Sequence, residues 1–125
     1  FPSGLRPFGV SFLYAGYDVH YGYQLYHSDP SGNYGGWKAT AIGAKHQQAQ
    51  SILKQEHKAD MSLKEALQLT VKVLNKTLDT TTIKPDRLEF TVLTKGADGH
   101  PKLMVLTEKQ IADLIASCDL EKKEE

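Results

Sequence analysis

Hydrophobic side chains in this chain change their spacing in a fixed order, from a period of two to a helical period, back to two, and finally to a helical period again. In the first third, Tyr21, Tyr23 and Leu25 alternate with other residue types, which is typical of a strand with two different faces. The preceding segment 8–17 is rich in aromatic and branched residues and poor in charge, so it predicts another strand.

Segment 29–36 is dense in turn-forming residues and predicts a tight connection to a third strand over 37–43. A tight turn there requires backbone that only glycine adopts without strain. We therefore expect a positive φ at one or more of the three glycines of this connection, which are Gly32, Gly35 and Gly36.

The middle of the chain has helical spacing. A narrow apolar stripe predicts one helix over about 44–57. A second helix has a clear start, because Ser62 is followed three residues later by Glu65, the pattern of a capping box. Its apolar arc continues to Leu78 and is wide, which predicts a mostly buried helix.

The last third returns to strands, because Leu88, Phe90 and Val92 alternate with polar residues. Segment 96–101 predicts a turn, after which 103–106 pairs back. A two-stranded antiparallel unit is expected here.

A second capping-box pattern, Thr107 followed by Gln110, predicts the start of a final helix. This helix carries Cys118 on its apolar face. The complete order is βββααββα, which indicates an α+β fold with largely antiparallel strands. We expect one domain over residues 1–119 and a charged tail over 120–125.

Composition excludes several classes of partner. Fifteen basic and fifteen acidic residues give a formal net charge of zero, so no nucleic-acid partner is expected. The sequence contains no apolar run of the ~18 residues that a membrane span needs, so no membrane partner is expected. The single cysteine excludes an internal disulfide.

Residues with chemical potential are few. Ser51 and Lys54 have the spacing of a serine acyl-transfer motif, but its partner motifs are missing, so they are interpreted as helix surface. His20 and His27 would lie on opposite faces of a continuous strand, which argues against a shared ion. Cys118 is interpreted as a core residue. No phosphate-binding glycine loop is present, and we expect no metal or organic cofactor.

Three stretches carry recognisable motifs. The motif residues are Arg6, Pro7, Phe8 and Gly9 in one stretch, Asp29, Pro30, Ser31, Gly32 and Trp37 in a second, and Gly43 in a third. Together these motifs resemble a known family, the alpha-type subunits of the 20S proteasome. Further similar stretches are 41–44, 73–77 and 86–90, so the resemblance covers nearly the whole chain.

The resemblance implies the C-terminal half of a four-layer αββα sandwich of the N-terminal-nucleophile hydrolase type. It implies a non-catalytic subunit of the outer ring, which supports ring assembly, gated substrate entry and docking of regulatory particles. Neighbouring alpha and beta subunits would be its partners, in the cytoplasm and the nucleus. The missing N-terminal half of the same subunit would be a further partner.

The resemblance also implies that peptidase machinery is absent. Catalytic beta subunits use an N-terminal threonine, whereas this sequence begins with Phe1. Their supporting Gly-Ser-Gly-Ser-like segment corresponds to 41–44, which carries apolar residues. A second supporting segment is only half matched, by Asp79 and Thr82. Two alternatives stay open, an active N-terminal-threonine peptidase of the same fold and an unrelated small α+β binding module.

If the chain is only half of the four-layer sandwich, part of its surface is left uncovered. We expect one sheet face, lined by Phe12, Tyr14, Phe90 and Val92, to lack its cover, and strand edges to remain unpaired. Exposed apolar faces and free edges both favour association.

Overall fold

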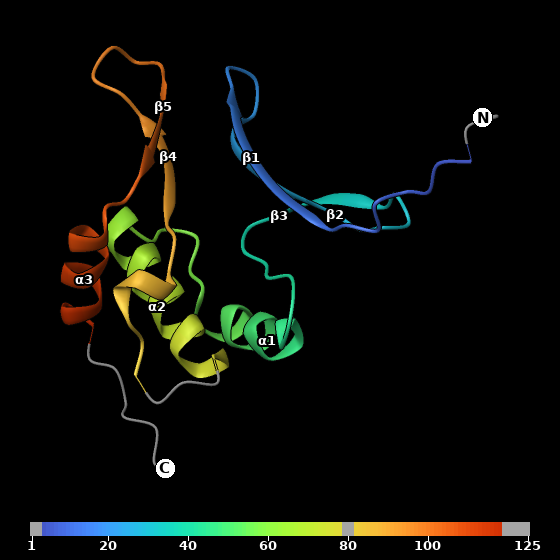
Figure 1. The fold of residues 1–125 in the computed structure, drawn as a ribbon. Helices are drawn as coiled ribbons and strands as arrows, with labels where there is room; N and C mark the ends of the chain where they lie inside the picture. The colour runs from blue at the N-terminus through green and yellow to red at the C-terminus, as the bar shows by residue number, and fades with distance from the viewer. Residues whose placement is uncertain (1–3, 79–81, 119–125) are drawn as a thin grey trace.

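The computed structural model describes residues 4–78 and 82–118, and its element order is the predicted βββααββα with one short 3₁₀ turn added (Figure 1). The architecture is therefore mixed helix and antiparallel sheet, as predicted. The charged tail lies outside the described residues. The elements are β1 (Phe12–Asp18), β2 (Gly22–Ser28), β3 (Tyr34–Trp37), α1 (His46–Glu56), α2 (Leu63–Thr77), η1 (Pro85–Arg87), β4 (Thr91–Lys95), β5 (Pro101–Val105) and α3 (Glu108–Ala116).

The first three strands form an antiparallel sheet in the order β1-β2-β3. Tyr14 lies opposite Tyr26 in the register, and Tyr17 lies opposite Tyr23. Directly opposed residues point to the same face of a sheet. One face therefore carries Tyr14 and Tyr26, and the other carries Tyr17 and Tyr23.

The third strand differs from its prediction, because β3 spans Tyr34–Trp37 and not 37–43. The turn is shorter than expected and ends at Asn33, whose carbonyl oxygen accepts a hydrogen bond from Asp29 N at 3.0 Å. Pairing with β2 can then begin at Tyr34, opposite Ser28. Gly32 has a φ of 91°, which confirms the expected left-handed glycine.

Both predicted helix starts are confirmed. The Ser62 hydroxyl accepts from Glu65 N at 3.2 Å at the start of α2. At α3 the capping box is complete, because Thr107 N also donates to the Gln110 side chain at 2.8 Å. These contacts satisfy backbone N–H groups that the first turn of a helix leaves without partners.

The core lies on two sides of α2. On one side, Val71 packs with the buried residues Ile83, Leu88, Phe90 and Ile111, and Cys118 packs against this cluster as predicted. On the other side, Leu69 and Val73 of α2 pack with Ala49 of α1. The wide apolar arc of α2 thus serves two interfaces.

The predicted uncovered face is only half right. Phe12 and Tyr14 are 57% and 45% exposed, but Phe90 and Val92 are 6% and 5% exposed. The reason is that Phe90 belongs to the cluster around α2 and α3, whereas β1 and β2 belong to a separate sheet from β4 and β5. Phe90 also precedes β4, although its carbonyl oxygen accepts from Leu106 N at 2.9 Å.

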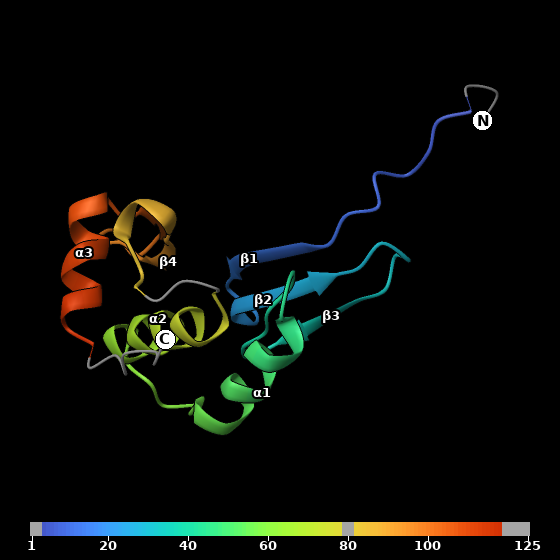
Figure 2. The ribbon, with the colours of Figure 1, turned by 60° about the horizontal axis from the view of Figure 1, so that its bottom comes forward.

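The sheet of β1, β2 and β3 lies to one side of the helical part in both views (Figures 1 and 2). Among the described residues, none before Ala49 is buried. Residues 4–11 run away from the start of β1 as an extended segment (Figure 2). This sheet is therefore held by its strand pairing and turns, and no core cluster of the described residues includes it.

We expect Gly32→Val to lower the free energy of unfolding by about 1 kcal/mol or more, because a β-branched residue is strained at this φ. Gly35→Val is the matched control. An added Cβ there meets no atom within 4 Å, and valine favours strands. Urea unfolding followed by circular dichroism measures both variants, and equal stability would contradict the turn assignment.

Candidate functional site

An aromatic ladder covers one face of the three-stranded sheet. The rings of Tyr14 and Tyr26 stack with centroids 5.7 Å apart and planes 13° apart. An added Cβ on Gly36 would lie 3.7 Å from Cε1 of Tyr26, so the tyrosine ring lies directly over this glycine of β3. Phe12 extends the same face toward the start of β1. Phe12 and Tyr14 are exposed and Tyr26 is half-buried, and such a row of aromatic rings on a regular sheet is suited to packing against another chain segment.

A chain of hydrogen bonds fixes this ladder. The hydroxyl of Tyr26 donates to Gln24 Oε1 at 2.7 Å, and Gln24 Nε2 donates to Asp18 Oδ2 at 2.8 Å. The other oxygen of Asp18 accepts from the backbone N of His20 and of Tyr21. The tip of the β1–β2 hairpin is thereby tied to the aromatic ring on β2.

These contacts favour the ionised form of Asp18. The hydrogen bond from Tyr21 N lowers the pKa of the Asp18 carboxyl, and those from His20 N and Gln24 add to it against the opposing effect of desolvation. The pKa therefore lies below the ordinary value of 3.8.

Asp29 acts similarly at the other end of β2. Its Oδ1 accepts from the Ser31 hydroxyl at 2.5 Å, from Ser31 N at 2.9 Å and from Asn33 N at 3.1 Å. The Ser31 hydroxyl is the main cause of a lowered pKa for the Asp29 carboxyl, and the two backbone donors and the positive field of His27 contribute. The carboxylate thus holds the β2–β3 turn.

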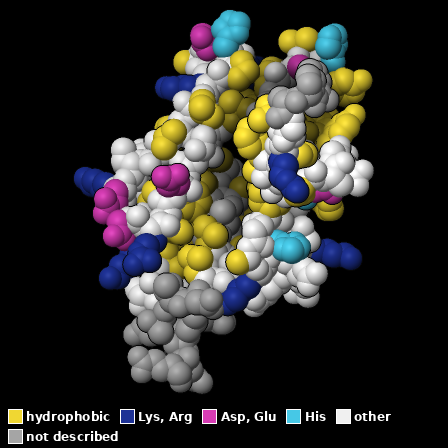
Figure 3. All heavy atoms as spheres, turned by 45° about the vertical axis from the view of Figure 1, so that its right-hand side comes forward, with side chains coloured by type: hydrophobic (Ala, Val, Ile, Leu, Met, Phe, Trp, Pro, Cys, Tyr) yellow, Lys and Arg dark blue, Asp and Glu magenta, His cyan; other side chains and the backbone are white. Residues whose placement is uncertain are grey.

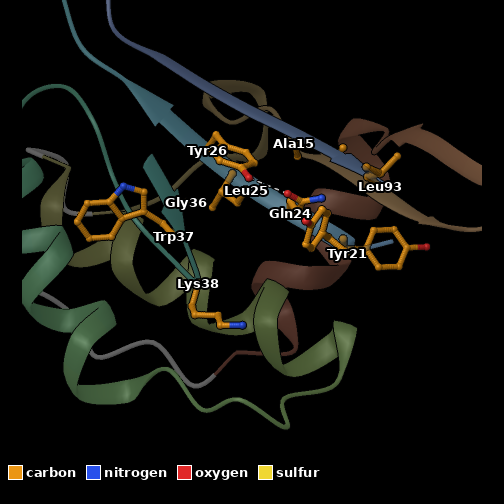
Figure 4. Close-up of a pocket in the computed structure, with 11 residues that line it drawn as sticks. Ala15, Tyr21, Gln24, Leu25, Tyr26, Gly36, Trp37, Lys38 and Leu93 are labelled. Carbon is orange, nitrogen blue, oxygen red and sulfur yellow. Dashed lines mark hydrogen bonds between the residues drawn. The ribbon is translucent and has the colours of Figure 1, made fainter. Parts of the chain in front are cut away.

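A hollow of about 560 Å³ borders the sheet. Tyr23, Leu25 and Trp37 line it from one face, Gln24, Tyr26 and Gly36 of the aromatic face also line it, and Leu93 lines it from β4. Figure 3 shows hydrophobic side chains on both walls of the hollow between the sheet and the helical part. In Figure 4, Leu93 and Trp37 lie at opposite ends of it. Tyr23 and Trp37, on the face opposite the Tyr14–Tyr26 stack, are 48% and 50% exposed, so this face is open as well.

Nothing in the described residues assembles catalytic or metal chemistry. Ser51 and Lys54 are exposed on α1, as expected for helix surface. His20 lies in the turn after β1 and not on a strand, so the strand-parity argument does not apply to it. Residues 4–78 and 82–118 contain no group of three or more His, Cys, Asp or Glu side chains placed to hold an ion. The thiol of Cys118 donates to the carbonyl oxygen of Leu114 at 3.2 Å.

The motif residues other than Gly43 fall into two places. Segments 6–9 and 29–32 lie at the same end of the sheet, because Phe12 pairs with Ser28. All four residues Arg6, Pro7, Phe8 and Gly9 are exposed. Trp37 is the last residue of the edge strand β3 and lies opposite Leu25 at the midpoint of β2. The sequence motifs therefore mark a sheet end and a strand end, and they do not converge on one pocket.

Gly43 has a structural role at the entry to α1. Its φ is 96°, and its carbonyl oxygen accepts from His46 N at 3.2 Å and contacts His46 Nδ1 at 2.9 Å. Ala41 packs against the cluster between α1 and α2. The stretch 41–44 is thus a helix-entry loop with apolar side chains. Asp79 lies outside the described residues.

The hydrogen-bonded chain of Asp18, Gln24 and Tyr26 was not identified from the sequence. Its signal was the hairpin register, because a turn centred on residue 20 pairs Tyr14 with Tyr26 and Gly16 with Gln24. The approach of Leu93 to the sheet had no local signal, since it depends on packing between distant elements.

Among helices within the described ranges, none combines the length and the apolar character that crossing a bilayer requires.

Comparison with known proteins gives a consistent result. The family model described as "Proteasome subunit" matches residues 2–93. Proteasome subunit alpha type-4 of Dictyostelium discoideum is 54% identical over 124 residues, which is 98% of this chain and 49% of that protein. Proteasome subunit alpha type-4-A of Arabidopsis thaliana is 64% identical over 88 residues, 70% of this chain and 35% of that protein. Proteasome subunit alpha type-3 of Saccharomyces cerevisiae is 49% identical over 124 residues, which is 98% of this chain and 48% of that protein.

The Dictyostelium discoideum and Saccharomyces cerevisiae relatives match this chain almost from end to end. The chain spans about half the length of each of them. The resemblance seen in the motifs is confirmed at the level of the family and of alpha-type relatives.

The lowered pKa values of Asp18 and Asp29 predict that the folded state loses stability in acid. A depressed carboxyl pKa stabilises the folded state above the pKa of the unfolded chain, and this stabilisation is lost as the pH falls through the folded-state value. We expect the carboxyl carbons of Asp18 and Asp29 to titrate below 3.8 in an NMR titration. Asp29→Ala is the control, because it should leave the titration of Asp18 unchanged. Midpoints above 3.8 would contradict both networks.

Proposed function

Because this chain belongs to the proteasome subunit family, we propose that it is part of an alpha-type subunit, a non-catalytic component of the outer ring of the 20S core. The observation that carries the proposal is the near end-to-end similarity to proteins named as alpha subunits. The role would be to build the ring that gates substrate entry and receives regulatory particles during protein degradation, in the cytoplasm and the nucleus.

The helix-entry loop supports a non-catalytic role. Catalytic relatives carry serine hydroxyls in the segment that resembles 41–44, and hydroxyl groups there would support the nucleophile. In this chain Ala41 instead packs against the helices and Gly43 provides the left-handed backbone before α1. The alternative of an active peptidase would require hydroxyl support from other positions.

The open sheet supports the proposed partners. Two kinds of surface need cover, the aromatic face with Phe12 and Tyr14 and the hollow with Trp37 and Leu93. The relatives are about twice as long as this chain. A subunit of that length would have further strands and helices in its other half. We propose that this other half of the subunit covers the sheet, and that neighbouring alpha and beta subunits contact the assembled domain.

Particle purification tests the proposed role. When the chain is tagged at its C-terminus in its own cells, we expect the tag to copurify with intact 20S particles and to lie in the outer ring by electron microscopy. A covalent inhibitor directed at N-terminal threonine should label other subunits of the particle and not this chain. A tag found only outside particles would contradict the ring assignment, and stoichiometric labelling would contradict the non-catalytic assignment.

The uncovered sheet predicts self-association of the isolated 125-residue polypeptide. We expect oligomers in size-exclusion chromatography with light scattering, because exposed aromatic faces and free strand edges associate. Phe12→Lys should reduce this association. Ser11→Lys is the matched control, since it adds the same charge at a neighbouring exposed position without removing an apolar side chain. A monomer that melts cooperatively would show that the sheet needs no cover.

A further inference from the structure

The tip of the β4–β5 hairpin carries the one place in this sequence where an aspartate is followed by a glycine, Asp98–Gly99. Gly96 N donates to the carbonyl oxygen of His100 at 2.7 Å, and Gly99 N donates to the carbonyl oxygen of Gly96 at 3.0 Å. The φ of Gly99 is 83°. The tip is therefore a three-residue loop that depends on a left-handed glycine at its last position.

The carboxyl group of Asp98 lies back over this loop. Its Oδ1 accepts a hydrogen bond from His100 N at 3.1 Å, and it lies 3.0 Å from the position of a Cβ added to Gly96. Asp98, Gly99 and His100 are all exposed. A hydrogen-bond donor at Oδ1 stabilises the negative charge that develops on this oxygen when a nucleophile attacks Cγ.

The backbone nitrogen of Gly99 is the nearest nucleophile along the chain. Bond formation between this nitrogen and Asp98 Cγ closes a five-membered ring. Intramolecular reactions of this kind have a high effective concentration of the nucleophile. Gly99 has no side chain to obstruct the approach, and its backbone is the least restricted of any residue type.

The other aspartates that the structure describes lack this combination. Asp29 is followed by Pro30, whose nitrogen has no hydrogen to lose. Asp18 is followed by the β-branched Val19. Backbone donors, chiefly Tyr21 N, lower the pKa of the Asp18 carboxyl, and an ionised carboxylate is a poor electrophile. Larger residues, namely methionine, arginine and leucine, follow Asp60, Asp86 and Asp113.

We propose that Asp98–Gly99 is a site of spontaneous isoaspartate formation. Gly99 N loses its proton and attacks Cγ of the protonated Asp98 side chain. The N–Cγ bond forms, the Cγ–OH bond breaks, and water leaves, which gives a cyclic succinimide. Water then adds back to the ring. Addition at Cγ restores aspartate, whereas addition at the backbone carbonyl carbon breaks the original peptide bond and leaves Gly99 linked through Cγ.

The proposal assigns no partner to the surface of the chain. Both reacting groups belong to the hairpin tip, water is the only co-reactant, and no atom is gained or lost overall. The inference goes beyond the ring assignment and does not depend on it.

The hairpin controls the reaction and is changed by it. The Gly99 N–H must leave the carbonyl oxygen of Gly96 before its proton can be lost, so the reaction proceeds from a tip that has opened locally. Isoaspartate adds one atom to the backbone between residues 98 and 99. A three-residue loop cannot absorb this atom and keep both of its closing hydrogen bonds. The modification therefore loosens the turn between β4 and β5.

Incubation of the 125-residue polypeptide in mildly acidic buffer, followed by trypsin digestion, tests the proposal. The tryptic peptide 96–102 contains Asp98 as its only aspartate, and the peptide 59–64 contains only Asp60. Asp60 is also exposed in a turn, so it is the matched internal control. We expect peptide 96–102 to separate with time into two species of equal mass, and peptide 59–64 to remain one species. Electron-transfer fragmentation identifies the isoaspartate, and a sample digested at the start controls for conversion during digestion.

Variants connect the chemistry to the turn. Asp98→Glu should abolish the second species, because its ring would have six members and close far more slowly, while the charge is kept. Asp98→Asn should convert faster at neutral pH, because ammonia leaves without prior protonation of a carboxylate. In the parent chain, loss of hydrogen-exchange protection at the Gly96 and Gly99 amides should grow with the isoaspartate fraction. The amide of Val71 in the core should keep its protection.

Either of two results would overturn the proposal. One is a single, unchanged species of 96–102 from the incubated chain under conditions in which the synthetic peptide of the same sequence isomerises, because the folded hairpin would then prevent the reaction. The other is equal conversion at Asp60, because the glycine and the loop geometry would then not select the site.

Discussion

Helix α2 is the element on which the remaining order of the helical part depends, because it packs on two sides at once. Val71 has no exposed surface and faces the cluster that contains Phe90 and Ile111. Val73 faces the cluster shared with α1. A helix with two apolar sides fixes α1 relative to α3, and α1 lies across a hollow from the chain that leaves β3. The position of α1 beside the end of the sheet therefore depends on packing in a core that lies elsewhere.

The three-stranded sheet is stabilised differently. Its strands are ordered by pairing, by the Tyr14–Tyr26 stack and by carboxylates at its turns, while none of its residues belongs to a core cluster of the described chain. Backbone pairing sets register but contributes little net stability without buried side chains. The molecule thus combines a helical part with its own core and a sheet that presents both faces for contact.

Local signals predicted local features well. Ser62 and Thr107 marked their helix starts because a cap depends only on residues within one turn. Two neighbouring strands were predicted at 8–17 and from Tyr21, but their register was not, and the structure sets it by pairing Tyr14 with Tyr26. The third strand was misplaced because residues 34–36 read as turn formers, whereas their pairing with β2 is decided by how soon the Asp29 carboxylate closes the turn. The burial of Phe90 and Val92 depended on contacts with α2 and α3, which alternation alone cannot assign to one sheet or another. For the site, the sequence motifs marked Trp37 and Gly43, but the hollow between the end of β3 and α1 depends on tertiary packing that no local pattern predicts.

The two aspartates of the sheet stand at opposite ends of β2, and each fixes the turn beside it. A strand clamped at both ends keeps its full length even when nothing covers it. A polypeptide arriving on this sheet would then meet an ordered template, and the entropy of straightening the strand would already have been lost during local hairpin formation. Such a surface is recognised by docking of one ordered layer on another, at a rate set by encounter and orientation and not by folding of the sheet itself.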